Sequence, residues 1–234
     1  AGGAAIAARR LHAGLRALGQ DSLMLVGQKD GPDPRVLVVP PQDPSWSRRE
    51  AAARRIERWV YGRNRSGISN TRFTLPYPGR DVSRAAAVVA SDVVNLHWVG
   101  SLLSPENVAA LLATGKPVVW TMHDQNPFSG GCHYSAGCLG YERDCRDCPQ
   151  LRDPSRQLPA LVLAAKKRLW RGGMTVVAPS RWLAACARCS ALFSGLRVEV
   201  IANSLDHQAF RPRDREAVRA ELGLRNDCLY LLFS

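Results

Sequence analysis

Four of the seven cysteines in this 234-residue chain fall within one short segment. Cys132, Cys138, Cys145 and Cys148 are spaced Cys-x5-Cys-x6-Cys-x2-Cys. One Cys-x-x-Cys pair with two nearby thiols can complete a tetrahedral Zn²⁺ site, and four thiolates leave no open coordination position. The segment therefore predicts a structural rather than a catalytic metal, with His133 as a spare ligand. Free thiols, disulfides or a redox role are the alternatives.

Two histidines stand at the ends of apolar runs that are typical of β-strands. His97 and Trp98 close one run, and His123, followed by Asp124, closes another. In an open α/β sheet, ligands bind where the carboxyl ends of parallel strands meet. We therefore expect these four residues at a ligand-binding edge. The alternatives are a structural role for a histidine at a strand end and ordinary core packing for Trp98.

A pair of glycines, Gly2 and Gly3, leads directly into a predicted helix. Without Cβ atoms, this backbone can approach a diphosphate closely, and the helix N-terminus offers free N–H groups with partial positive charge. The pair is therefore a candidate phosphate-binding loop. A tight strand-to-helix turn without a ligand is the alternative reading.

The elements that must position these residues alternate along the chain between β-type runs and amphipathic helical segments. This alternation predicts an α/β fold in which a Rossmann-like parallel sheet is flanked by helices. The expected helices cover 4–18, 46–62, 81–90, 105–113, 155–171, the segment that Ser180 caps, and 214–222. The expected strands cover 22–26, 36–39, 92–98, 117–123, 175–178, 198–202 and 228–233.

We expect residues 1–206 to form one N-terminal domain with a Cys-rich insertion over 124–154. The glycine pair normally follows a first strand, so we expect that this strand is missing. Residues 207–234 are expected to hold a hinge and the first strand of a truncated second domain, because the apolar run at 228–233 has no element after it.

The charge balance favours anionic partners. The chain has 32 Lys and Arg residues against 20 Asp and Glu residues, a formal net charge of +12. Such a balance suits nucleic acid, anionic membrane or phosphorylated small molecules, and a solvated basic surface is the alternative. The basic residues are spread along the chain and no nucleic-acid motif occurs, so we expect no nucleic-acid partner.

One segment, 46–65, concentrates arginine in the pattern of a basic amphipathic helix. Its arginines are Arg48, Arg49, Arg54, Arg55, Arg58, Arg63 and Arg65. Trp46, Ile56, Trp59 and Val60 share its apolar side. Such a helix can lie on an anionic membrane or bind a phosphorylated lipid. The alternative is a helix packed on the sheet with a solvated arginine face.

Several classes are disfavoured by what the sequence lacks. No run approaches the ~18 apolar residues of a membrane span, and the start has no basic region followed by an apolar run. We therefore expect a cytoplasmic protein, with peripheral contact at the inner face of the membrane through segment 46–65. No Gly-x-Gly-x-x-Gly follows a strand, which disfavours a dinucleotide oxidoreductase.

Taken in order, these segments resemble glycosyltransferase family 4, the retaining "group 1" enzymes of the GT-B fold. The markers lie at 2–5, 95–98, 121–124, 127–134, 145–151, 178–183 and 200–206. The resemblance runs from Gly2 to about Leu224, and within the family it is strongest to enzymes of bacterial exopolysaccharide assembly, such as the colanic-acid type. It implies an N-terminal half only. The family's second domain binds most of the nucleotide, so we expect the 234-residue piece alone to transfer little or no sugar.

The resemblance implies transfer of a sugar, with retention, from a nucleotide-diphosphate sugar to a glycan or lipid-linked acceptor, without a catalytic metal. It implies that His123 faces the donor sugar near its anomeric carbon and that Asp124 orients His123 or binds the acceptor. It assigns the other site residues to the two substrates. Gly2, Gly3 and Asn203 are expected to bind the donor, and His97, Trp98 and Ser180 the acceptor. At 203–206 the family's usual Asn-Gly is Asn-Ser here, although Asn203 can still contact the cleft.

A second hypothesis belongs to another class of protein. The chain can also be interpreted as a zinc-stabilised basic binding module without catalysis. Salt-dependent retardation of a nucleic acid in a gel would favour that interpretation.

Overall fold

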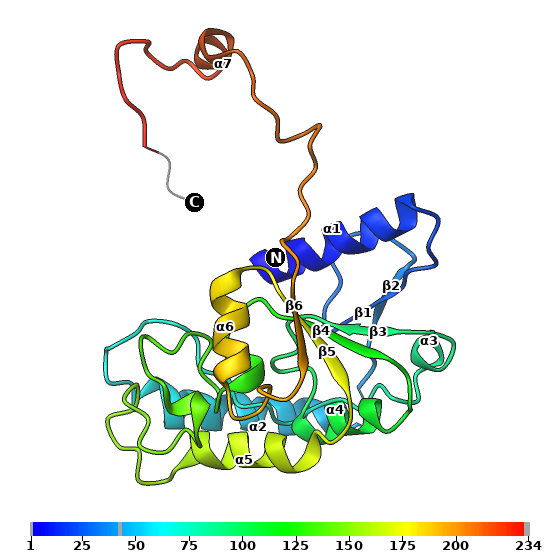
Figure 1. Ribbon diagram of the computed structural model, residues 1–234, viewed down its shortest axis with the longest axis vertical. Coiled ribbons are helices and arrows are strands. Elements are labelled where there is room, and N and C mark those ends of the chain that lie inside the picture. The colour runs from blue at the N-terminus through cyan, green and yellow to red at the C-terminus, as the bar shows by residue number, and fades with distance from the viewer. Residues whose placement is uncertain (1, 42–43, 232–234) are drawn as a thin grey trace. The chain divides into compact units, whose positions relative to one another are not determined.

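The computed structural model describes residues 2–41 and 44–231. The chain divides into two compact units, Ala1–Asn203 and Ser204–Ser234. The first unit is an α/β structure with parallel strands and helices around them (Figure 1). The predicted Rossmann-like fold class is therefore confirmed.

A four-stranded sheet forms the centre of the first unit. Its strands are β3 (Val94–Leu96), β4 (Val118–Thr121), β5 (Met174–Ala178) and β6 (Arg197–Val200). They lie in the order β3-β4-β5-β6, and each neighbouring pair is parallel. Because all four run the same way, their carboxyl ends share one edge. Two further strands, β1 (Met24–Val26) and β2 (Val36–Val38), pair in parallel as a separate sheet.

Helices alternate with these strands as expected. They are α1 (Gly3–Ala17), α2 (Trp46–Glu57), α3 (Ala86–Val89), α4 (Pro105–Leu112), α5 (Leu158–Leu169), α6 (Arg181–Cys189) and α7 (Arg215–Glu221). Helix α4 begins with a capping box, in which Ser104 and Asn107 bond each other's backbone N–H groups. Helices α4 and α5 pack together, and the Trp170 indole donates to the Pro105 carbonyl at 2.9 Å.

The core between the sheet and α5 is aromatic. Trp120 of β4 lies against Trp170 with ring centroids 5.0 Å apart, and both rings contact the fully buried Phe193. Phe128 meets Phe193 edge-on at 6.0 Å. This packing holds the end of β4, and the loop that follows it, against α5.

Some elements differ from the sequence expectation for local reasons. The helix expected over 81–90 forms only as α3, because the Asp81 carboxylate accepts the Ser83 N–H and sets a turn first. The helix expected over 46–62 is α2 followed by a π-helical turn, Arg58–Gly62. The helix expected from 155 begins after Gln157, which adopts a left-handed conformation.

The Cys-rich loop, residues 124–154, contains only two short 3₁₀ turns, Asn126–Phe128 and Gly140–Glu142. Two isolated antiparallel bridges tie it to an earlier segment, Phe73 to Cys132 and Arg65 to Leu151. A second buried apolar cluster forms where these segments meet, from Tyr61, Phe73, Cys132, Cys148 and Leu151.

The second unit is short and exposed. Helix α7 starts where the Asp214 carboxylate accepts the Ala217 N–H at 2.7 Å. The strand expected over 228–233 does not form in residues 228–231, and the remaining positions lie outside the described residues. In place of strand pairing, the Arg219 guanidinium donates to the Cys228 carbonyl and lies over the Tyr230 ring. Among the described helices, none is both long enough and apolar enough to cross a membrane.

Candidate functional site

Two histidines meet at the carboxyl edge of the sheet. His97 follows β3 and His123 follows β4, so the parallel register of these strands brings their side chains together. His97 Nδ1 and His123 Nε2 are 3.0 Å apart, a hydrogen-bond distance, and the two rings stack with centroids 5.2 Å apart. One imidazole donates the shared proton and the other accepts it.

Burial keeps this pair neutral. It lowers the pKa of His97 to about 4, and the neighbouring His123 acts in the same direction. Burial also lowers the pKa of His123 below its ordinary value, whereas the nearby Asp124 opposes that shift. At neutral pH, each uncharged imidazole can donate a hydrogen bond to a neutral ligand group or accept one from it.

Asp124 is the centre of a second set of contacts beside the pair. Its Oδ2 accepts from the Trp98 indole at 3.1 Å and lies 2.6 Å from His133 Nδ1. Its Oδ1 accepts the Asn126 backbone N–H at 2.9 Å. Three donors thus fix the orientation of one carboxylate. The side chain hydrogen-bonded to His123 is His97 rather than Asp124.

His133 and Thr74 belong to this site, although sequence reasoning did not place them there. His133 is almost fully buried, and its Nε2 lies 2.7 Å from the Thr74 hydroxyl. The contacts are satisfied when Thr74 donates to His133 Nε2 and His133 Nδ1–H donates to Asp124. Both ring nitrogens of His133 are then hydrogen-bonded. Its partners are Thr74 and Asp124 and not a metal shared with the cysteines, for which it was a spare ligand candidate.

The remaining predicted residues lie at element ends. Gly2 and Gly3 begin α1, and a Cβ at either position would meet nothing within 4 Å. The Ser180 hydroxyl accepts the Leu183 N–H and caps α6. Asn203 is the exposed last residue of the first unit. In the described part of the chain, no hydrogen bond joins these four residues to the histidine pair or to Asp124.

The four predicted metal ligands face one space. Cys132, Cys138, Cys145 and Cys148 all line one small cavity, and none is in a disulfide. Burial raises the pKa of Cys132 to about 12 and that of Cys145 to about 11. As the side chains stand, no three His, Cys, Asp or Glu residues among those described are arranged to hold a metal ion.

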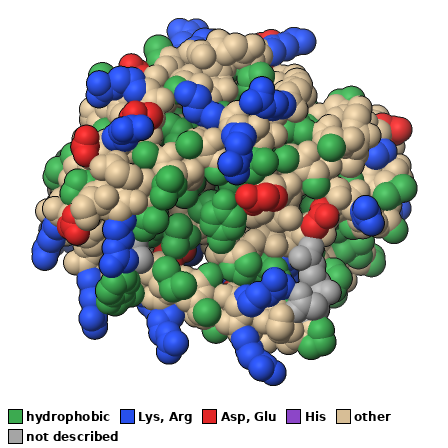
Figure 2. Space-filling model, turned by 90° about the horizontal axis from the view of Figure 1, so that it is seen from below, with side chains coloured by type: hydrophobic (Ala, Val, Ile, Leu, Met, Phe, Trp, Pro, Cys, Tyr) green, Lys and Arg blue, Asp and Glu red, His purple; other side chains and the backbone are tan. Residues whose placement is uncertain are grey.

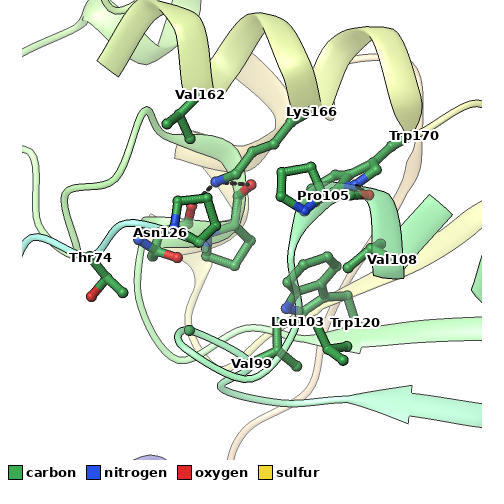
Figure 3. A pocket seen from close by; sticks show the side chains of 13 residues that line it. Thr74, Val99, Leu103, Pro105, Val108, Trp120, Asn126, Val162, Lys166 and Trp170 are labelled. Carbon is green, nitrogen blue, oxygen red and sulfur yellow. Dashed lines mark hydrogen bonds between the residues drawn. The ribbon is translucent and has the colours of Figure 1, made fainter. Parts of the chain in front are cut away.

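A second small cavity lies between α4, α5 and the loop after β4 (Figure 3). Its lining is mostly apolar, with Thr74 and Asn126 on one side and Trp120 and Trp170 on the other. The fully buried Lys166 donates to the carbonyls of Asn126, Pro127 and Ser129. Burial lowers the pKa of Lys166 to about 8. This lysine therefore holds the start of the Cys-rich loop on α5.

The fold and the site together define a Rossmann-like domain whose polar residues gather at the ligand-binding edge of its sheet. Residues 2–220 match the family model described as "Glycosyl transferase 4-like domain". The chain therefore belongs to the glycosyl transferase 4-like family, as its motifs predicted.

The chain is similar to WcaC of Escherichia coli (strain K12), whose name describes a colanic acid biosynthesis glycosyl transferase. It is 28% identical to this chain over 143 residues. The match covers 54% of this chain and 34% of WcaC, so the chain matches about a third of its relative's length.

Proposed function

We propose that this chain is part of an enzyme that transfers a sugar from a nucleotide-diphosphate sugar to a glycan or lipid-linked acceptor in polysaccharide biosynthesis, with retention at the anomeric carbon. Membership of the glycosyl transferase 4-like family supports the reaction class. The observation that carries the proposal is the hydrogen-bonded His97–His123 pair at the carboxyl edge of the sheet. The name of WcaC supports polysaccharide biosynthesis as the setting.

His123 is proposed to contact the donor sugar. Its Nε2 is occupied by His97, while nothing among the described residues hydrogen-bonds its Nδ1. That nitrogen can bond a sugar hydroxyl or a charge that develops near the anomeric carbon, where an oriented dipole stabilises the transition state. His97 positions His123 through the shared hydrogen bond.

Asp124 is proposed to bind acceptor hydroxyls. A carboxylate is an acceptor-only group with about four lone-pair sites, and Trp98, His133 and Asn126 use three of them. The geometry also gives Trp98 a positioning role, because its indole N–H holds Asp124 while the Arg72 guanidinium covers its ring at 5.2 Å. Contact of His97 and Ser180 with the acceptor remains a prediction from the family resemblance.

The donor diphosphate is proposed to lie at the start of α1. This 15-residue helix begins at Gly3, and the space around Gly2 and Gly3 is open to a ligand. Helix N-termini favour phosphate because their first N–H groups lack intrahelical partners. Asn203 is proposed to contribute to the same side of the cleft.

We further propose peripheral contact with an anionic membrane. Helices α2 and α5 lie on the lower side of the first unit in Figure 1, and Figure 2 shows this side with Lys and Arg side chains around apolar ones. On and just after α2, Ile56 and Trp59 are each 53% exposed, beside the exposed Arg55 and Arg58. Exposed apolar side chains among arginines suit the interface of an anionic bilayer.

The function is tested on the full-length protein. The protein is incubated with a panel of nucleotide sugars and acceptor lipids, and release of the nucleoside diphosphate is followed. We expect release from one donor, at least a hundredfold less in His123→Ala, and unchanged release in His207→Ala. His207 is an exposed histidine of the second unit and serves as the matched control. No release from any donor, or equal release in both variants, would overturn the proposal.

A further inference from the structure

Four thiols of the Cys-rich loop converge on one cavity. Cys132, Cys138, Cys145 and Cys148 reach it from three stretches of the Cys-rich loop, and three of the four are buried. Outside the two 3₁₀ turns, this loop has no helix or strand of its own. Such a loop gains order when a ligand joins its separate stretches.

Hydrogen bonds hold the segments that carry the thiols, and one of them reaches a sulfur. The Gly140 backbone N–H donates to Cys138 Sγ at 3.3 Å. The segments around the other thiols are tied by backbone contacts: the Ser129 hydroxyl donates to the Cys132 carbonyl at 2.7 Å, and the Leu151 N–H donates to the Cys148 carbonyl at 3.1 Å. Donors of this kind orient the ligands of metal centres and accept their negative charge. A thiol that merely fills an apolar core needs no such partner.

The backbone around the thiols is held in unfavourable conformations. Ala136, Cys145 and Asp147 have positive φ angles of 52°, 57° and 49°, although none is a glycine. This left-handed region is unfavourable for residues that carry a Cβ. Strain of this kind persists only where surrounding interactions fix the backbone, and a bound metal would provide that constraint.

A buried positive charge lies beside two of the thiols. Lys166 is fully buried, bonds three neutral carbonyls, and is close enough to Cys132 and Cys145 for their charges to interact. A divalent cation with four thiolates carries a net charge of −2. The buried Lys166 would offset part of that charge.

We propose that Cys132, Cys138, Cys145 and Cys148 bind one structural Zn²⁺ ion. Sulfur ligands select zinc over magnesium or calcium, and four of them close the coordination shell. Since the side chains do not stand in coordinating positions, the thiols rotate into the cavity on binding, to a Zn–S distance of about 2.3 Å, and release their protons. The bound ion fixes the backbone of Cys132, and with it the adjacent His133 that holds Asp124.

The test measures metal in the complete protein, purified without a histidine tag. Elemental analysis is expected to give one zinc per chain in the wild type and none in the Cys145→Ser, Cys148→Ser double variant. The matched control is Cys186→Ser with Cys189→Ser, which removes the Cys-x-x-Cys pair of α6 and is expected to keep the zinc. Zinc that persists in the first double variant would overturn the proposal.

A second measurement decides the matter if that variant does not fold. Wild-type protein loaded with Co²⁺ in place of Zn²⁺ is expected to show the intense visible absorption of tetrahedral cobalt and a sulfur-to-cobalt charge-transfer band. Absence of both bands, with the four thiols titrating as free in the native protein or recovered as two disulfides, would overturn the proposal. These readouts are independent of sugar transfer.

Discussion

His97 and His123 share one hydrogen bond, and burial disfavours the charged form of both. For His97 the pKa falls from 6.5 in the unfolded chain to about 4 in the folded one. The unfolded state therefore binds more protons between these values, so the pair's contribution to stability is complete above pH 6.5 and is lost as the pH falls toward 4.

We therefore predict that the free energy of unfolding declines by about 1–2 kcal/mol more between pH 6.5 and 4 in the wild type than in His97→Asn. Urea denaturation at a series of pH values measures this difference, with His207→Asn as a control that follows the wild type. Parallel pH profiles for wild type and His97→Asn would show that burial does not disfavour the charge on His97.

The sequence indicated that His97, Trp98, His123 and Asp124 would lie together, because each pair follows an apolar run in a predicted parallel sheet. The partners of Asp124 could not be predicted in the same way. Thr74 and His133 are 59 residues apart and both lie in irregular segments, where no periodicity fixes which side chains meet. His133 lay within the marker segment 127–134, but its position beside Cys132 suggested metal binding instead.

At the scale of elements, two glycines allow the Cys-rich loop to pass close to its neighbours. A Cβ on Gly130 would lie 2.3 Å from the Pro159 carbonyl oxygen, and one on Gly131 would lie 2.7 Å from the Phe73 ring. The contact at Gly130 is with backbone at the start of α5, which cannot rotate away. The glycine is therefore required by the close approach of loop and helix.

We predict that Gly130→Ala lowers the free energy of unfolding by about 2–3 kcal/mol, because the added methyl forces loop and helix apart. The matched control is Gly195→Ala, where a Cβ meets nothing within 4 Å and the change should stay within about 0.5 kcal/mol. Denaturant midpoints of the two variants and the wild type provide the measurement. Equal midpoints for the two variants would contradict the close approach.

Element boundaries show why the helices and strands were only partly predictable. The two central strands, β4 and β5, were found from apolar runs, since burial selects residues such as Val and Trp regardless of distant contacts. Helix α3 was overestimated because local bonding by Asp81 competes with helix formation. Residues 228–231 have the composition of a strand, but a strand also needs a partner, which sequence alone does not supply.

At the scale of the whole molecule, the formal net charge of +12 favours contact with anionic surfaces. We predict that the complete protein sediments with vesicles of phosphatidylcholine and phosphatidylglycerol but not with phosphatidylcholine alone, and that added salt weakens binding. Ile56→Ser with Trp59→Ser should reduce binding several-fold. Val89→Ser, which alters an equally exposed residue at the end of α3, should not. Equal loss in both variants would contradict a docking role for this side.

The His97–His123 contact also makes the two strands sensitive to what occupies the edge of the sheet. If a ligand group accepts a hydrogen bond from His123 Nδ1–H, Nε2 of the neutral ring carries no hydrogen, and His97 must donate to it from Nδ1. If the ligand group donates to Nδ1 instead, Nε2 carries the proton and His97 becomes the acceptor. Whether a bound hydroxyl accepts from or donates to His123, at the end of β4, thus determines which tautomer His97 adopts at the end of β3.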